Sequence, residues 1–189
     1  MARRADRALD RGVTLIEAMV VVTIVGILVA TVAPGFGGVL AEHRVVAAAT
    51  DVLHALTLAR AEAMRRSQRV YVAPIGGRWR DGWLLFVDRN DNRVFDAGID
   101  ELIARHDALA PTTTVTNPTS PAREPFTDVG SPARTYVLFD ATGYPRQRNG
   151  GFSAGSMTFT DRNGAARAVR TLCVAAYGRV RIVEAPSCG

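Results

Sequence analysis

The longest stretch of the chain without a charged side chain runs from Ala18 to Ala41 and consists mainly of Val, Ile, Leu, Ala and Met. An apolar run of about 18 or more residues is long enough to cross a bilayer as a helix. Arginines at positions 3, 4, 7 and 11 precede the run, and such a flank indicates a cytoplasmic N-terminus. Glu17 lies at the start of the apolar segment, where a carboxylate requires a partner. The sequence therefore predicts a single membrane helix with the C-terminal remainder on the far side.

Gly12 is followed by Val13-Thr14-Leu15-Ile16-Glu17 and then by the apolar run. This arrangement resembles the class III signal of type IV pilins and type II secretion pseudopilins. The resemblance implies that a prepilin peptidase cleaves after Gly12 and methylates the new N-terminus at Val13. It also implies that Glu17 pairs with the N-terminal ammonium of a neighbouring subunit, and that Pro34 kinks the helix. The alternatives are a secretory signal, which would have a shorter apolar region and a small-residue cleavage site, and an ordinary membrane anchor.

A second helical pattern follows the apolar run. Apolar residues recur at spacings of three and four and would form one face of an amphipathic helix, at Val45, Ala49, Val52, Leu56, Ala59 and Ala63. The Ala-Arg-x-Glu-Ala pattern within Leu58–Arg66 resembles the FimT/GspH branch of the pilin-like proteins, as do the segments Phe139–Pro145 and Ala176–Ile182. Arg60 and Glu62 are also compatible with a solvated helix face.

Short strands and turns are predicted for the rest of the chain. Aromatic and β-branched residues are typical of strands, and Gly82–Asp88 carries the strongest such pattern. Pro111–Pro132 is rich in Pro, Thr and Ser, which predicts a long irregular segment. Asn163-Gly164 predicts a hairpin turn. Further strands are expected at Val70–Ile75, Leu102–Arg105, Thr135–Phe139, Ser156–Thr160, Ala168–Ala175 and Arg179–Glu184.

One long helix followed by strands predicts an α+β fold. By its family resemblance, this is a pilin-like fold in which the long N-terminal helix packs on a C-terminal antiparallel β-sheet domain. The predicted divisions are a leader peptide at 1–12, a hydrophobic transmembrane and assembly helix at 13–41, an amphipathic half at 42–67, and a periplasmic or extracellular domain at 68–189.

The basic residues are all arginine, and the formal net charge is +5. This charge is compatible with nucleic-acid binding but does not by itself argue for it. The two cysteines are Cys173 and Cys188. An exported domain folds in an oxidising compartment, so a disulfide between them is expected, with two free thiols as the alternative.

Gly178-Arg179-Val180-Arg181 is the strongest candidate for a binding element. On an extended segment, Arg179 and Arg181 would point to one face about 6.6 Å apart, which is twice the strand rise. Each guanidinium could then hold a backbone phosphate, and Gly178 would allow a tight turn. The element is similar to the one through which FimT-type minor pilins contact DNA during natural transformation. Arg146 and Arg148 are candidates to extend the basic surface; alternatively, the arginine pair lies on a solvated strand and pairs with acids.

Two other patterns suggest chemistry but lack required residues. Gly151–Gly155 matches G-x-S-x-G, but in α/β-hydrolases the catalytic His follows the Ser, whereas every His here precedes it. Asp88–Ile99 resembles a calcium loop at four positions, but Arg93 stands where Gly is needed and Ile99 where Glu is needed. An Asp/Asn-rich turn is the preferred interpretation of this segment. We therefore expect no enzyme activity, no catalytic residue, no cofactor and no metal site.

Together these features predict a FimT-like minor pilin of a type IV pilus that binds double-stranded DNA non-specifically for natural transformation. The alternatives are an H-type minor pseudopilin of type II secretion or a minor pilin that only primes assembly. The family resemblance implies prepilin peptidase, other pilins and inner-membrane lipid as partners. It also implies a bacterial inner-membrane location with a periplasmic C-terminus, followed by incorporation into a surface pilus.

Overall fold

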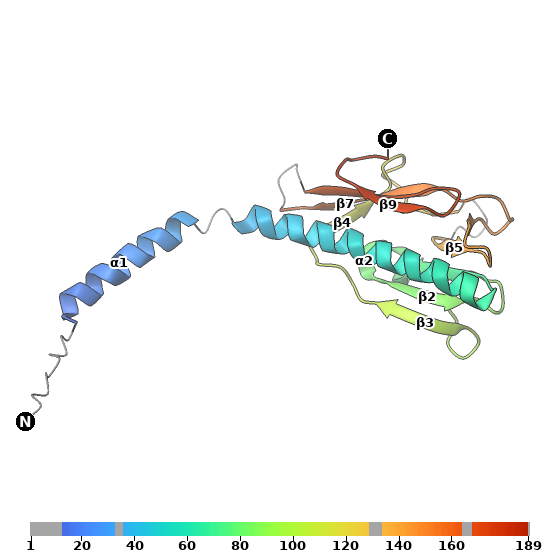
Figure 1. Ribbon diagram of the computed structural model, residues 1–189, viewed down its shortest axis with the longest axis horizontal. Helices are drawn as coiled ribbons and strands as arrows, with labels where there is room; N and C mark the ends of the chain where they lie inside the picture. Colours follow the sequence, from blue (N-terminus) through green and yellow to red (C-terminus); the bar gives the residue numbers. More distant parts are fainter. Residues whose placement is uncertain (1–12, 33–35, 129–133, 164–167, 189) are drawn as a thin grey trace, which may run out of the picture. The chain divides into compact units, whose positions relative to one another are not determined.

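The computed structural model describes residues 13–32, 36–128, 134–163 and 168–188. The chain divides between Gly37 and Gly38 into two compact units, which are considered separately (Figure 1). The predicted divisions after residues 12, 41 and 67 stay predictions.

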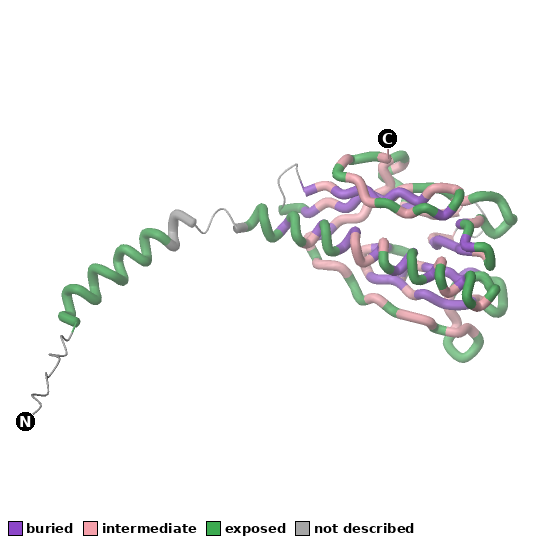
Figure 2. Tube along the Cα trace, in the orientation of Figure 1, coloured by how far each residue is buried: buried purple, intermediate pink, exposed green. Residues whose placement is uncertain are grey.

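In the first unit, helix α1 spans Leu15–Val32. The backbone N–H of Glu17 donates a hydrogen bond to the Thr14 hydroxyl at 3.3 Å. Thr14 and Glu17 have the spacing of a capping box, so the Thr-Leu-Ile-Glu motif also begins the helix. The described side chains of α1 are exposed, as Figure 2 shows. Within the described residues, no helix combines the length and the apolar character expected of a membrane span.

Helix α2 spans Phe36–Arg66, and from Gly38 onward it belongs to the second unit. Its predicted apolar face is confirmed, because each of its six residues has a relative exposure of 0%. Buried and exposed turns alternate along α2 in Figure 2. The buried face contacts both β-sheets within one continuous core (Figure 1). Burying this stripe is what holds the helix, since amphipathic packing supplies most helical stability in proteins.

The first sheet has five antiparallel strands in the order β3-β2-β1-β5-β6. Their bounds are Val70–Pro74 for β1, Trp83–Val87 for β2, Glu101–His106 for β3, Val137–Phe139 for β5 and Pro145–Arg146 for β6. In β2, Trp83 and Leu85 face the α2 core, whereas Phe86 joins a second buried cluster that includes Tyr71. Both faces of this strand are therefore buried, which explains its continuous apolar sequence.

The second sheet has four antiparallel strands in the order β4-β7-β8-β9. Their bounds are Thr113–Thr116 for β4, Gly155–Asp161 for β7, Val169–Val174 for β8 and Val180–Val183 for β9. Met157 and Leu172 pack in the α2 core. Thr158 and Thr171 lie on the opposite face, with their hydroxyl oxygens 3.0 Å apart. Alternate residues thus face opposite sides of the sheet, and the C-terminal segment covers the side that holds the two threonines.

The α+β architecture is confirmed, but strands β4 and β6 are not among those expected from the sequence. β4 lies inside Pro111–Pro132, which was predicted to be irregular. Its pairing partner is β7, more than 40 residues away in register, with Thr114 opposite Thr160. A local composition rule cannot detect this strand, because hydrogen bonds to a distant segment hold it in place.

Candidate nucleic-acid interface

A tight turn joins β8 to β9 and contains Gly178, the first residue of the Gly-Arg-x-Arg element. The Gly178 N–H donates to the Ala175 carbonyl at 2.8 Å, and the Ala175 N–H donates to the Arg179 carbonyl at 2.9 Å. Gly178 has a φ of 84°, in the left-handed region that side chains rarely adopt. Glycine therefore suits this position, because any other residue would strain the turn that leads into β9.

Gly178 is also in close contact with a second turn. A Cβ atom at Gly178 would lie 2.6 Å from the carbonyl oxygen of Gly143. Gly143 itself has a φ of 77° and approaches Met64 of α2. The two segments that resembled the FimT/GspH branch therefore meet in space, although they are distant in sequence.

Arg60 of α2 connects this junction to the helix, and sequence reasoning had assigned it no role. Its Nη1 donates to the Gly178 carbonyl oxygen at 2.8 Å. The side chain is half-buried, so the solvated-face interpretation is wrong for Arg60. The only sequence feature that pointed to a role for Arg60 was its place in the Ala-Arg-x-Glu-Ala pattern. Glu62 in that pattern instead accepts hydrogen bonds from Arg65 and Arg66.

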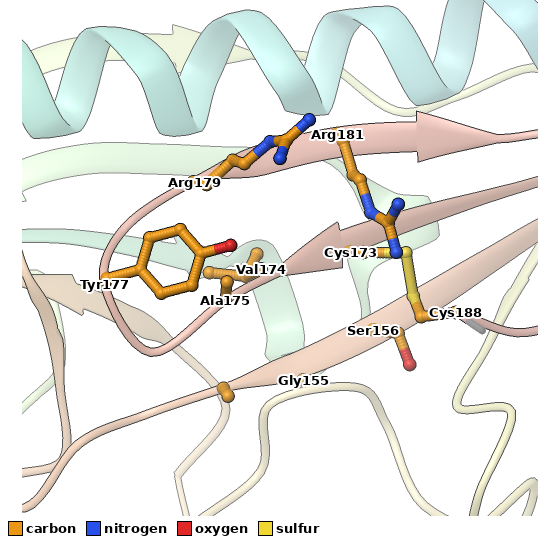
Figure 3. Close-up of a pocket in the computed structure, with 10 residues that line it drawn as sticks. Gly155, Ser156, Cys173, Val174, Ala175, Tyr177, Arg179, Arg181 and Cys188 are labelled. Carbon is orange, nitrogen blue, oxygen red and sulfur yellow. A yellow bond between two sulfur atoms is a disulfide. The ribbon is translucent and has the colours of Figure 1, made fainter.

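Arg179 and Arg181 are both exposed on the outer face of the second sheet. Val180 between them packs against the core, while Arg181 lies opposite Cys173 of β8. Both arginines line one hollow of about 520 Å³ (Figure 3). The described residues that line it carry no carboxylate, and they are Ala154, Gly155, Ser156, Cys173, Val174, Ala175, Tyr177, Arg179, Arg181 and Cys188. The hollow therefore brings two guanidinium groups to one place on the surface.

A disulfide between Cys173 and Cys188 closes one side of the hollow. The expected pairing is thus confirmed, with the Cα atoms 6.0 Å apart. The Thr171 hydroxyl donates to the carbonyl of Ala185 at 2.6 Å, and the Thr158 hydroxyl donates to that of Pro186 at 3.1 Å. These bonds hold the C-terminal segment against the outer face of the sheet, beside Arg181.

Arg146 and Arg148 have different surroundings. Arg146 pairs with Asp140 at 2.7 Å, and its guanidinium lies 4.4 Å from the centre of the Phe152 ring. It lines a second hollow, which shares Ala154, Gly155 and Ser156 with the first. Arg148 lies 3.4 Å from Asp91 and lines neither hollow. Of the two, Arg146 alone is adjacent to the Arg179–Arg181 surface.

Asp140 is the acid that organises the second turn. Burial raises its pKa, but hydrogen bonds from Thr142, Arg146 and the Tyr144 N–H outweigh this effect and lower the pKa to about 2. Asp140 is therefore ionised at neutral pH and forms an ion pair with Arg146. This pairing reduces the contribution that Arg146 can make to an anion site.

The predicted processing residues lie in the first unit. Gly12 and Pro34 lie outside the described residues. Val13 is 73% exposed, and Glu17 is exposed in the first turn of α1. Their roles in cleavage, methylation and assembly stay predictions.

In the calcium-like loop, the Asp side chains accept hydrogen bonds from other residues of the same loop. Asp88 accepts hydrogen bonds from the backbone N–H groups of Asn92 and Arg93. Hydrogen bonds from the Asn90 and Asn92 amides lower the pKa of Asp96. Across the described residues, no group of three acidic, His or Cys side chains is arranged to hold a metal ion. This geometry is that of an Asp/Asn-stabilised turn.

The family model described as "Type II transport protein GspH" matches residues 48–178, more than half of the chain. The chain belongs to the GspH family. A second model, the "Prokaryotic N-terminal methylation motif", matches residues 7–33 of this GspH-family protein. The predicted FimT/GspH relationship is therefore confirmed.

Two known proteins are similar to this GspH-family protein. Pilin-like protein PilA1 of Thermus thermophilus is 37% identical over 98 residues, which are 51% of this chain and 59% of PilA1. The chain thus spans less than two thirds of that relative. The crystal structure of type IV minor pilin FimU from Pseudomonas aeruginosa matches with a TM-score of 0.53 at 18% identity, over 75% of this chain and 89% of FimU. The FimU match establishes a shared pilin-like fold.

Proposed function

We propose that this GspH-family protein is a FimT-like minor pilin of a type IV pilus that binds DNA through Arg179 and Arg181. The observation that carries the proposal is the pair of exposed arginines in one hollow whose described walls hold no carboxylate. Such a site attracts polyanions, because two exposed guanidinium groups concentrate positive charge at one hollow. In natural transformation, the bound polyanion would be incoming DNA.

The chemistry of the two arginines favours phosphate. A guanidinium group offers a planar fork of N–H donors that matches two phosphate oxygens. Two such groups on alternate positions of one strand can hold neighbouring backbone phosphates. Contacts of this kind bind DNA with little sequence preference and weaken steeply with salt. Gly178 and Arg60 would act indirectly by fixing the turn that presents the pair.

Arg146 would extend this surface, whereas Arg148 would contribute less. The hollow beside Arg146 adjoins the first through Ala154, Gly155 and Ser156. That second hollow also contains the Asp128 carboxylate, which pairs with Arg93. Phosphate affinity should therefore be strongest at the β8–β9 hairpin and decline toward Arg146.

We propose the processing route typical of the family. The methylation motif across residues 7–33 supports cleavage after Gly12 by prepilin peptidase and methylation of Val13. The 13–41 segment would then anchor the subunit in inner-membrane lipid, with its C-terminus in the periplasm. Glu17 would pair with the N-terminus of a neighbouring pilin when the subunit enters the filament at the cell surface.

A second candidate function is a minor pseudopilin of type II secretion. The family description, which names type II transport, favours it. In that role the protein would bind other pseudopilins, and Arg179 and Arg181 would have no DNA ligand. An assembly-priming minor pilin would likewise bind only other subunits.

Fluorescence anisotropy with labelled double-stranded DNA tests the DNA-binding function. The full chain, purified in a non-ionic detergent, would be titrated at several salt concentrations. Arg179→Gln and Arg181→Gln should each weaken binding and reduce the slope of log affinity against log salt by about one. Arg105→Gln is the matched control, because it removes an exposed charge from edge strand β3 of the other sheet. Absence of binding at low salt, or an equal loss in Arg105→Gln, would instead favour the secretion or priming role.

A further inference from the structure

Tyr177 lies at the tip of the β8–β9 turn and lines the same hollow as Arg179 and Arg181 (Figure 3). It is 60% exposed, although a tyrosine ring is large and mostly apolar. The turn beneath it is closed by the Gly178-to-Ala175 hydrogen bond and held to α2 by Arg60. The ring is thus presented to solvent from a rigid base.

Among the described residues, the other exposed aromatic rings already have partners. Tyr144 and Phe152 contact each other with their centres 6.4 Å apart, and Arg146 lies over the Phe152 ring. In the described part of the chain, no ring–ring or cation–π contact involves Tyr177. Its face is therefore open to a planar ligand.

The combination of an open ring with two cations distinguishes one form of nucleic acid from another. Phosphate contacts alone do not favour single strands, since duplex DNA has the higher charge density. An unpaired base, by contrast, can stack on an aromatic side chain, and the bases of a duplex cannot because they are already stacked. The hollow of about 520 Å³ lies within the range of small-molecule sites, so one nucleotide can enter it.

We propose that the hairpin site accepts a single-stranded segment of DNA, with one unpaired base stacked on Tyr177 and its flanking phosphates held by Arg179 and Arg181. This proposal rests on the proposed DNA-binding function and names the form of DNA that the site prefers. Duplex DNA would still bind, but through its phosphates alone.

The test uses three labelled probes with the full chain in non-ionic detergent. They are a short oligodeoxythymidine, the same strand with abasic positions, and its duplex with oligodeoxyadenosine. Wild type should bind the thymidine strand about 5- to 150-fold more tightly than the abasic strand, the range expected for one base stacked on an aromatic ring. The duplex should bind more tightly than the abasic strand only to the extent that its higher charge density explains.

Variants assign the preference to the ring. Tyr177→Leu should bind the thymidine strand with the affinity that wild type shows for the abasic strand and should leave the affinity for the duplex unchanged. Tyr177→Phe should keep the preference for the thymidine strand. Tyr144→Leu is the matched control, because Tyr144 is a partly exposed tyrosine that lines neither hollow.

The outcomes separate this inference from the proposed function. If wild type binds the abasic and thymidine strands equally, or if Tyr177→Leu keeps the preference, the stacking proposal is overturned while phosphate binding stands. If wild type binds none of the three probes at low salt, the proposed function fails and the stacking proposal fails with it. The comparison of probes on wild type decides the matter even if a Tyr177 variant folds poorly.

Discussion

Gly178→Ala is the substitution that most directly tests how the Arg179–Arg181 hairpin is held. The new methyl group would lie 2.6 Å from the Gly143 carbonyl oxygen, a distance that real Cβ contacts do not tolerate. It would also lie 3.2 Å from Cζ of Arg60, whose Nη1 donates to the Gly178 carbonyl. The first contact is with backbone, so one of the two turns must move.

The cost can be separated into a backbone part and a contact part. A residue with a Cβ at positive φ costs about 1–2 kcal/mol, offset in part by the lower entropy of the unfolded chain. Overpacking against a neighbouring backbone typically costs about 1–3 kcal/mol more. Gly178→Ala should therefore lower the free energy of unfolding by about 2–4 kcal/mol.

Gly150→Ala isolates the contact part. Gly150 has the same φ of 84°, but no heavy atom lies within 4 Å of its virtual Cβ in the described structure. Urea unfolding of the full chain in non-ionic detergent can be followed by tryptophan fluorescence, since Trp79 and Trp83 are both buried. At an m-value of about 1–3 kcal/mol/M, the midpoint of Gly178→Ala should fall by roughly 1 M more than that of Gly150→Ala.

Equal midpoints for the two variants would refute the reasoning. That result would mean that the Gly143 and Gly178 turns do not constrain each other, and that the hairpin is not positioned through them. A larger loss in Gly178→Ala, accompanied by weaker DNA binding, would connect the packing of the turn to the site.

Two further predictions concern the same junction. Arg60→Ala should lower the free energy of unfolding by about 2 kcal/mol, because it removes a charged donor to the Gly178 carbonyl; Arg65→Ala, which removes an exposed pair with Glu62 on the same helix, should cost below about 0.5 kcal/mol in the same urea assay. The pKa of Asp140 is lowered from 3.8 to about 2 in the folded state, so its stabilisation is present above pH 4 and is lost as the pH falls toward 2. This loss should be about 2 kcal/mol, and Asp140→Asn, measured by urea unfolding across that pH range, should remove it; an unchanged pH dependence would contradict the assignment.

Local sequence patterns determined the parts of this protein that depend on residues close together in the chain. The α2 stripe, including Val52 and Leu56, was predicted correctly because burial of a helix face follows a spacing of three and four residues. Strand β2 was predicted because its aromatic and β-branched residues carry their own preference. The pairing of Cys173 with Cys188 followed from there being two cysteines in an exported domain.

Tertiary structure alone decided which of these segments come together. β4 forms because β7 offers it hydrogen-bond partners from a distant part of the chain. Arg60 contacts the β8–β9 hairpin because α2 lies beside it, and Arg146 is paired because Asp140 lies across its own turn. Spacing predicted that Arg179 and Arg181 share a face. Long-range packing decided which residues line their hollow. It left no acidic residue in the described wall, and it placed Tyr177 beside the two arginines.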